Sequence, residues 1–122
     1  AQKSLYCGNC LMHFGTDINS DGMVTNKNTQ FNLPNDSSLK IHVNVFDSKG
    51  KSLGFSKANV FIVQKDSKLN DLAVIVDEYM DQIDPKSWGF SFFFIVNTTG
   101  IYSVTVNDEN KQYMNSGYVI IK

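Results

Sequence analysis

Residues 39–46, Leu-Lys-Ile-His-Val-Asn-Val-Phe, place an apolar side chain at every second position. Successive side chains of a β-strand point to opposite faces of a sheet, so this alternation predicts a strand with one buried face. Further strands are predicted at 58–64, 90–96, 101–107 and 118–121, and turn residues at 98–100 predict that 90–96 and 101–107 form a hairpin. Turn residues separate these segments at intervals of about 8–12 residues, which favours a mainly β, antiparallel two-sheet sandwich of the Ig-like or jelly-roll kind.

Residues 71–83 break the alternation. Their large apolar side chains fall at i, i+3, i+4, i+7, i+8 and i+11, namely Leu72, Ile75, Val76, Tyr79, Met80 and Ile83. That spacing is typical of one face of an α-helix, with Asn70 or Asp71 as its N-cap and Pro85 just beyond its end. A strand over residues 72–76 is the competing interpretation, but it leaves the later apolar residues unexplained. We therefore expect one amphipathic helix near residues 71–83, inserted in the sandwich.

The length and charge of the chain limit its architecture and its partners. A chain of 122 residues, 42% of them hydrophobic, is long enough for one domain with a real core. We expect a polar N-terminal leader or loop region over 1–37 and a β-sandwich body over 38–122, together forming a single domain. The net charge of −1 provides no basic surface for nucleic acid, and no apolar run is long enough for a membrane span or a signal peptide.

The segment Asp-Ile-Asn-Ser-Asp-Gly at 17–22 spaces oxygen-bearing side chains two residues apart before a glycine, as Ca²⁺-binding loops do. The candidate ligands are Asp17, Asn19, Asp21, the carbonyl of Met23, and Thr25. An EF-hand needs a Glu at its twelfth position, where this chain has Asn28, and it needs flanking helices. A free-standing calcium loop and a plain turn of Asn, Asp and Gly therefore both stay open.

The two cysteines, Cys7 and Cys10, are separated by two residues near the start of the chain. A tight local disulfide and two free thiols in a flexible leader are the two main hypotheses. A redox dithiol would lie between a strand and a helix, and no helical pattern follows here. A zinc site would have to combine both cysteines with His13 and His42, the only histidines in the chain.

No sequence motif for catalysis is present: there is no G-x-S-x-G, no H-E-x-x-H and no glycine-rich phosphate loop. The chain is therefore expected not to be an enzyme. Aromatic and aliphatic residues in and around the strand predicted at 90–96 suggest binding instead. Trp88 precedes it and is a candidate platform for a sugar ring, although a lone Trp also serves as packing. Phe93 and Ile95 face away from Phe92 and Phe94, so they are candidate contacts for a protein partner.

Two segments resemble secreted Ig-like and jelly-roll accessory modules, across about 25 residues. One is residues 45–53, where a strand ends in D-x-x-G; the other is residues 92–106, which end in the G-x-Y-x-V-x-V strand at 100–106. The resemblance implies a non-catalytic module that binds or scaffolds another macromolecule, in a secreted, periplasmic or cell-surface location. At the level of architecture the chain is also similar to the outer-membrane lipoprotein of type VI secretion systems. The alternatives are accordingly a cell-envelope or secretion-system component that docks a partner subunit, and a carbohydrate-binding module.

Overall fold

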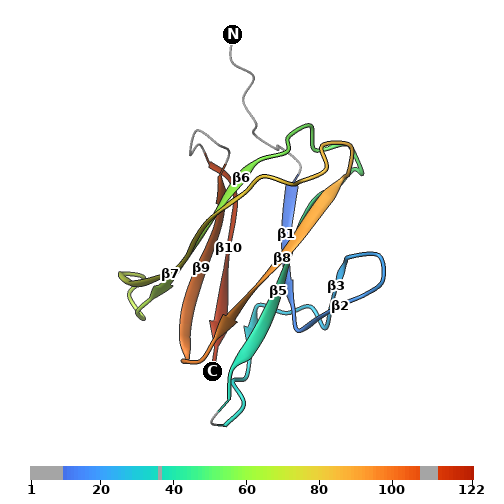
Figure 1. Cartoon of the computed structure of the whole chain (residues 1–122). Helices are drawn as coiled ribbons and strands as arrows, with labels where there is room; N and C mark the ends of the chain where they lie inside the picture. The colour runs from blue at the N-terminus through green and yellow to red at the C-terminus, as the bar shows by residue number, and fades with distance from the viewer. Residues whose placement is uncertain (1–9, 36, 108–112) are drawn as a thin grey trace.

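The computed structural model describes residues 10–35, 37–107 and 113–122, which form two facing β-sheets and a small hairpin (Figure 1). The three-stranded sheet has the order β1-β5-β8, with β1 at Cys10–Gly15, β5 at Leu39–Asp47 and β8 at Gly89–Val96. The five-stranded sheet has the order β4-β10-β9-β6-β7, with β4 at Gln30–Phe31, β10 at Tyr113–Ile121, β9 at Gly100–Asn107, β6 at Ala58–Lys65 and β7 at Asp71–Met80. The hairpin pairs β2 (Asp17–Ile18) with β3 (Val24–Thr25). All pairings among these strands are antiparallel except that of β4 with β10.

The core lies between the two sheets and follows the predicted alternation. Ile41, Val43 and Val45 of β5 are fully buried. The side chains that alternate with them face the outer side of the sheet, namely Lys40, His42, Asn44 and Phe46. Alternate residues of β9 do the same from the opposite sheet, beginning at Tyr102. The prediction of a mainly β sandwich is therefore confirmed.

The predicted helix at residues 71–83 is wrong, because residues 71–80 form β7 at the edge of the five-stranded sheet. The pairing of β7 with β6 shifts register twice, and these shifts leave Leu72 and Ile75 without a partner on β6. Each such bulge adds one residue to the strand and moves the apolar positions out of period two. The apolar spacing of 71–80 therefore looked helical although the backbone is extended, and no helix occurs in the described part of the chain. Accordingly, no membrane-spanning helix is found there.

The connection between β8 and β9 is a corner between the two sheets, and the sequence had suggested a hairpin there. β8 belongs to the three-stranded sheet and β9 to the five-stranded sheet. The hydroxyl of Tyr102, near the start of β9, donates to the carbonyl of Thr98 at 2.8 Å. A tyrosine that bonds back to the backbone a few residues upstream is a feature of immunoglobulin-like corners.

The described part of the predicted N-terminal leader belongs to the sandwich. β1 pairs with β5 along its whole length, and Phe14 lies in the core. The side chain of Asn115 on β10 donates to the carbonyl of Cys10 at 2.7 Å, which ties β1 to the opposite sheet. The polar composition of residues 1–37 therefore reflects the short β2, β3 and β4 with their loops more than β1.

Candidate functional site

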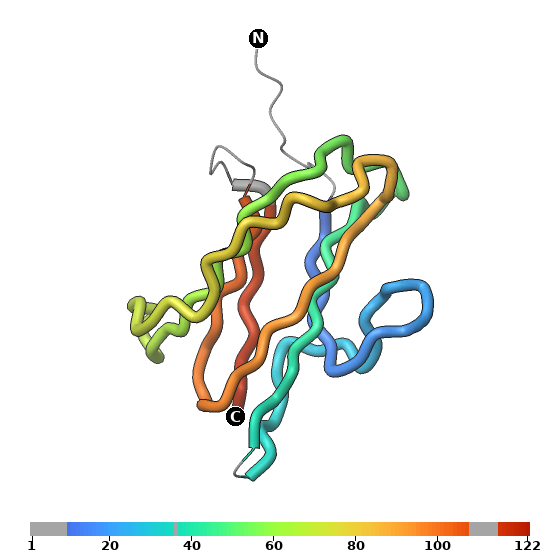
Figure 2. Tube along the Cα trace, viewed as in Figure 1, coloured from blue at the N-terminus to red at the C-terminus, as the bar shows by residue number. Residues whose placement is uncertain are grey.

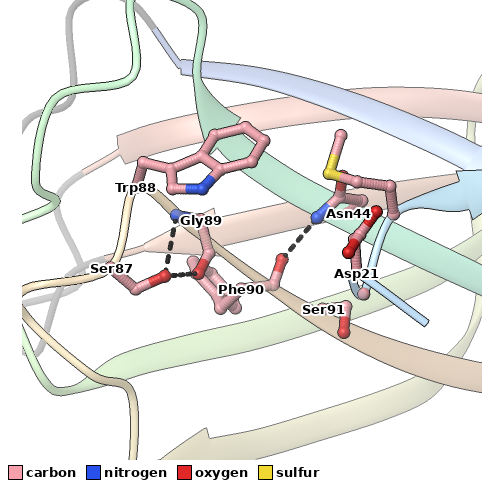
Figure 3. Close-up of a pocket in the computed structure, with 9 residues that line it drawn as sticks. Asp21, Asn44, Ser87, Trp88, Gly89, Phe90 and Ser91 are labelled. Carbon is pink, nitrogen blue, oxygen red and sulfur yellow. Dashed lines mark hydrogen bonds between the residues drawn. The ribbon is translucent and has the colours of Figure 1, made fainter. Parts of the chain in front are cut away.

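The β2–β3 hairpin and the start of β8 enclose a cleft of about 130 Å³ beside the three-stranded sheet (Figure 3). Its lining residues come from the hairpin tip (Asp21, Gly22 and Met23), from β5 (Asn44) and from residues 87–91. The hairpin can lie close to β1 because Gly15 has no Cβ, which would otherwise overlap the carbonyl oxygen of Thr25. A glycine at this position thus helps to set the hairpin against the sheet.

Asn44 is the buried polar residue of this cleft, and only 3% of its surface is exposed. Its Nδ2 donates to the carbonyl of Phe90 at 3.1 Å, as Figure 3 shows. Because a carbonyl can only accept, this bond fixes which end of the amide is nitrogen. The Oδ1 atom is buried and has no hydrogen-bond partner among the described residues. Asn44 therefore supplies a free acceptor.

Trp88 stands at the other side of the cleft and is 43% exposed. Its ring packs edge-to-face against Phe46, with centroids 5.6 Å apart, and Phe46 packs in the same way against His13 at 4.9 Å. The Trp88 carbonyl accepts the amide of Asp47 at 2.7 Å, which fixes the backbone before β8. Burial, and then the charge of Lys27, lower the pKa of His13. The exposed indole thus packs on Phe46, which packs on His13 in turn, and the lowered pKa of His13 favours its neutral form.

The candidate calcium ligands lie in the β2–β3 hairpin. Asn19 Oδ1 accepts the backbone amides of Asp21 and Met23, both at 3.0 Å, and Asp17 Oδ1 accepts the amide of Ile18 at 2.8 Å. These bonds form a local Asx-type turn, and Gly22 provides its positive φ of 79°. No group of three or more His, Cys, Asp or Glu side chains gathers in the described residues. The turn thus has its own hydrogen bonds, and calcium binding stays a prediction.

A second candidate surface, which we call the β7 edge, consists of Val76–Met80 on the outermost strand of the five-stranded sheet. In this segment β7 pairs regularly with β6 on one side and has no described strand on the other. Tyr79 is 50% exposed. Next to it, Asp77 lines an outer-face cavity of about 230 Å³ together with Asn59, Phe61 and Asn107. Figure 2 shows the turn between β6 and β7 and the β2–β3 hairpin on opposite sides of the view.

The predicted partner contacts Phe93 and Ile95 lie on the outer face of β8, 54% and 52% exposed. Lys40 places its Nζ 4.5 Å from the centroid of the Phe93 ring, and the ring of His42 lies 6.0 Å away. Part of this aromatic surface is therefore covered by a cation from the neighbouring strand. Whether the two residues bind a partner stays a prediction.

The predicted pair Cys7 and Cys10 is only partly described, because Cys7 lies outside the described residues. No described cysteine is free, and Cys10 is buried in the core. His13 lies on the outer face of β1 against Phe46, and His42 lies on the outer face of β5 beside Phe93. Because Cys10 and the two histidines face opposite sides of the same sheet, the four-residue zinc site is not assembled.

Sequence reasoning singled out Asp21, Met23 and Trp88 of the cleft, but it missed Asn44 in the cleft and Asp77 with Phe61 at the β7 edge. Asn44 occupies an outward position of an alternating strand, where a polar residue is ordinary, and its burial depends on the distant hairpin. Asp77 and Phe61 meet only because β6 pairs with β7, and the helical interpretation of residues 71–83 concealed that pairing.

Comparison with known proteins supports the fold and leaves the function open. No protein-family model and no curated protein sequence matches the chain. Among solved structures it is similar to an immunoglobulin-like protein from Pseudomonas aeruginosa, with a TM-score of 0.56 and 6% identity, over 92% of each chain. It is also similar to beta-glucosidase 3B from Thermotoga neapolitana, with a TM-score of 0.37 and 12% identity, over 90% of this chain and 16% of that one.

The first of these similarities agrees with the two-sheet topology and the Tyr102 corner, and the chain therefore has an immunoglobulin-like β-sandwich fold. At 6% identity the similarity concerns the fold alone. The chain spans about a sixth of the length of the beta-glucosidase, and at that TM-score the likeness carries no argument. Function must be argued from the surfaces.

Proposed function

We propose that this chain is a non-catalytic immunoglobulin-like module that works outside the cytoplasm and binds another protein through the β7 edge. The observation that carries the proposal is a regular strand segment, Val76–Met80, whose outer side has no neighbour in the described structure and whose Tyr79 is half exposed. An edge strand of this kind presents backbone donors and acceptors to which an extended segment can add.

The charges beside the β7 edge indicate the chemistry of the partner. Residues 71–80 contain three acidic residues and no basic residue. The one ion pair of the described residues joins Lys65 to Asp71 at 2.6 Å, so no cation from the described part of the chain pairs with Asp77 or Glu78. A Lys or Arg of the partner would lie beside Asp77 and against the Phe61 ring in the outer-face cavity.

A second copy of this chain fits the β7 edge less well than a basic partner does. Pairing two copies along β7 would bring together two acidic strands, neither of which carries a lysine for Asp77. We therefore propose an extended segment in which apolar residues alternate with Lys or Arg. Sedimentation of the purified chain, alone and with a selected peptide, separates these two occupants.

Selection of random displayed peptides against the purified chain tests the proposal. The enriched peptides are expected to alternate apolar and basic residues and to shift the backbone amide signals of residues 76–80. The double substitution Asp77→Lys with Tyr79→Lys is expected to abolish binding. The control, Phe93→Lys with Ile95→Lys, also introduces two lysines into an exposed strand, with a net change of +2 against +3 for the β7 variant, and is expected to leave binding intact.

Two results would contradict the proposal. Binding that survives the β7 substitutions excludes the β7 edge as the docking site. Binding that is lost only in the β8 control moves the protein contact to Phe93 and Ile95, the surface expected from the sequence.

The extracytoplasmic location is supported by the resemblance to secreted modules and by the predicted disulfide between Cys7 and Cys10. Disulfides persist in oxidising compartments and are rare in the cytosol. Mass spectrometry of the protein from its native source, after alkylation of free thiols, is expected to find the two cysteines joined. Full alkylation of both would count against this location.

A further inference from the structure

We propose that the cleft between the β2–β3 hairpin and β8 binds an alkylammonium group, carried by a lysine side chain or by a free primary amine. This cleft is separate from the β7 edge, and its function does not depend on that of the β7 edge. It is lined from two directions, by the hairpin tip on one side and by residues 87–91 on the other. Its volume of about 130 Å³ suits a small group at the end of a chain.

The first argument is the free acceptor in the cleft. Only 3% of the surface of Asn44 is exposed, and its Nδ2 already donates a hydrogen bond to the carbonyl of Phe90. The Oδ1 atom of the same amide is buried and receives no hydrogen bond from the described residues. A buried acceptor without a partner destabilises the fold, and a ligand that brings an N–H or O–H removes this penalty.

The second argument is the charge of the lining. Asp21 contributes a carboxylate, and Ser91 contributes a hydroxyl. No Lys or Arg is among the described residues that line the cleft, so no cationic side chain of theirs favours an anion. An ammonium group has three N–H donors, which matches one amide oxygen, one carboxylate and one hydroxyl.

The third argument is the exposed indole of Trp88, which stands beside these acceptors (Figure 3). The ring is 43% exposed and is held by its edge-to-face contact with Phe46. Trp provides the strongest aromatic partner for a cation, and the alkyl part of the ligand also packs on its apolar surface. Cation attraction, hydrogen bonding and apolar contact therefore favour the same class of ligand.

Titration of the isotope-labelled chain, followed by NMR in the presence of EDTA, tests this assignment. The probes are n-butylammonium, a capped lysine peptide, tetramethylammonium and methyl glucoside. The first two are expected to shift the Trp88 indole and Asn44 side-chain signals with saturation. Tetramethylammonium carries the charge without N–H groups and is expected to bind about tenfold more weakly.

Two substitutions distinguish attraction by the Asp21 carboxylate in the cleft from attraction by negative charge elsewhere on the surface. Asp21→Asn is expected to weaken binding of n-butylammonium about tenfold, because it removes the carboxylate and keeps the shape. Asp81→Asn, which removes an exposed carboxylate outside the cleft lining, is expected to have no effect. Equal weakening by both substitutions would overturn the proposal, since it would show only general charge attraction.

The outcomes of the titration decide the source of the ammonium group and the fate of the proposal. Tighter binding of the capped lysine peptide supports a protein-borne lysine, and equal or tighter binding of n-butylammonium supports a free amine. Saturable shifts with methyl glucoside alone would overturn the proposal in favour of a carbohydrate. Shifts with tetramethylammonium as strong as those with n-butylammonium, or no shifts with any probe, would overturn it as well.

Discussion

Substitution of Tyr102 by Phe is expected to lower the free energy of unfolding by about 1–2 kcal/mol. Tyr102 is 1% exposed, and its hydroxyl lies 2.8 Å from both the carbonyl oxygen and the Oγ1 of Thr98. Each neutral hydrogen bond contributes roughly 0.5–1.5 kcal/mol net. Phe keeps the ring and its contact with Phe94, whose centroid is 6.3 Å away. The substitution therefore isolates the hydroxyl at the corner between the sheets.

Urea unfolding followed by Trp88 fluorescence measures this difference, and thermal unfolding should show a drop of about 3–6 °C for each kcal/mol in a chain of this size. Tyr118→Phe is the matched control, because Tyr118 is 49% exposed. Its effect is expected to stay within about 0.5 kcal/mol. A further substitution, Tyr102→Ala, removes the ring and is expected to cost about 3–5 kcal/mol. If Tyr102→Phe and Tyr118→Phe are equally stable, the hydroxyl does not stabilise the corner and the reasoning fails.

Three further predictions concern pH, packing and calcium. Because burial lowers the pKa of His13 below 6.5 in the folded chain, the unfolded chain takes up this proton first, so stability should fall as the pH drops below about 6.5. The variant His13→Phe should lose this pH-dependent part of the stability, as measured by urea unfolding at a series of pH values. An unchanged dependence of stability on pH would exclude His13 as its source. Gly15→Ala should cost about 1–3 kcal/mol by overlap with the Thr25 carbonyl, and unaltered thermal unfolding would refute that contact. The calcium hypothesis predicts that Ca²⁺ at 100 times its Kd raises the free energy of unfolding by about 2.7 kcal/mol. The double variant Asp17→Ala with Asp21→Ala should lose this stabilisation. If EDTA has no effect on stability, the segment is a turn without a bound metal.

The alternation of apolar residues was sufficient to predict the strands that bury one face. β5 is the clearest case, since Ile41, Val43 and Val45 are all fully buried. The same pattern does not say which strands pair, because every antiparallel strand of this kind has the same period. Residues 90–96 and 101–107 therefore suggested a hairpin, whereas their strands lie in different sheets.

β7 was the element that local sequence could not predict. Its two register shifts depend on its pairing with β6, and they displace Leu72 and Ile75 from the regular alternation. The segment also has exposed apolar residues on an edge, where burial gives little periodic signal. The β7 edge became visible only when the pairing was known, and so did the cavity between Asp77 and Phe61.

The cleft likewise depends on contacts between distant parts of the chain. Trp88 and Asp21 were both singled out in the sequence, but for separate reasons, and the structure brings them to one cleft. Asn44 carried no signal, because its burial and its bond to Phe90 arise from the pairing of β5 with β8 and from the hairpin above them.

The position of β10 between β9 and β4 has a consequence for how the chain folds. β4 lies about 90 residues before its partner, since Gln30 pairs with Ile120, and β1 is tied to β10 through Asn115 and Cys10. During synthesis, neither of these early segments meets β10 until the final strand emerges. We therefore expect folding on the slow time scale of β-sandwiches, milliseconds to seconds. Chains interrupted before residue 113 would leave β4 unpaired and one edge of β9 open, and both would be prone to associate with other strands.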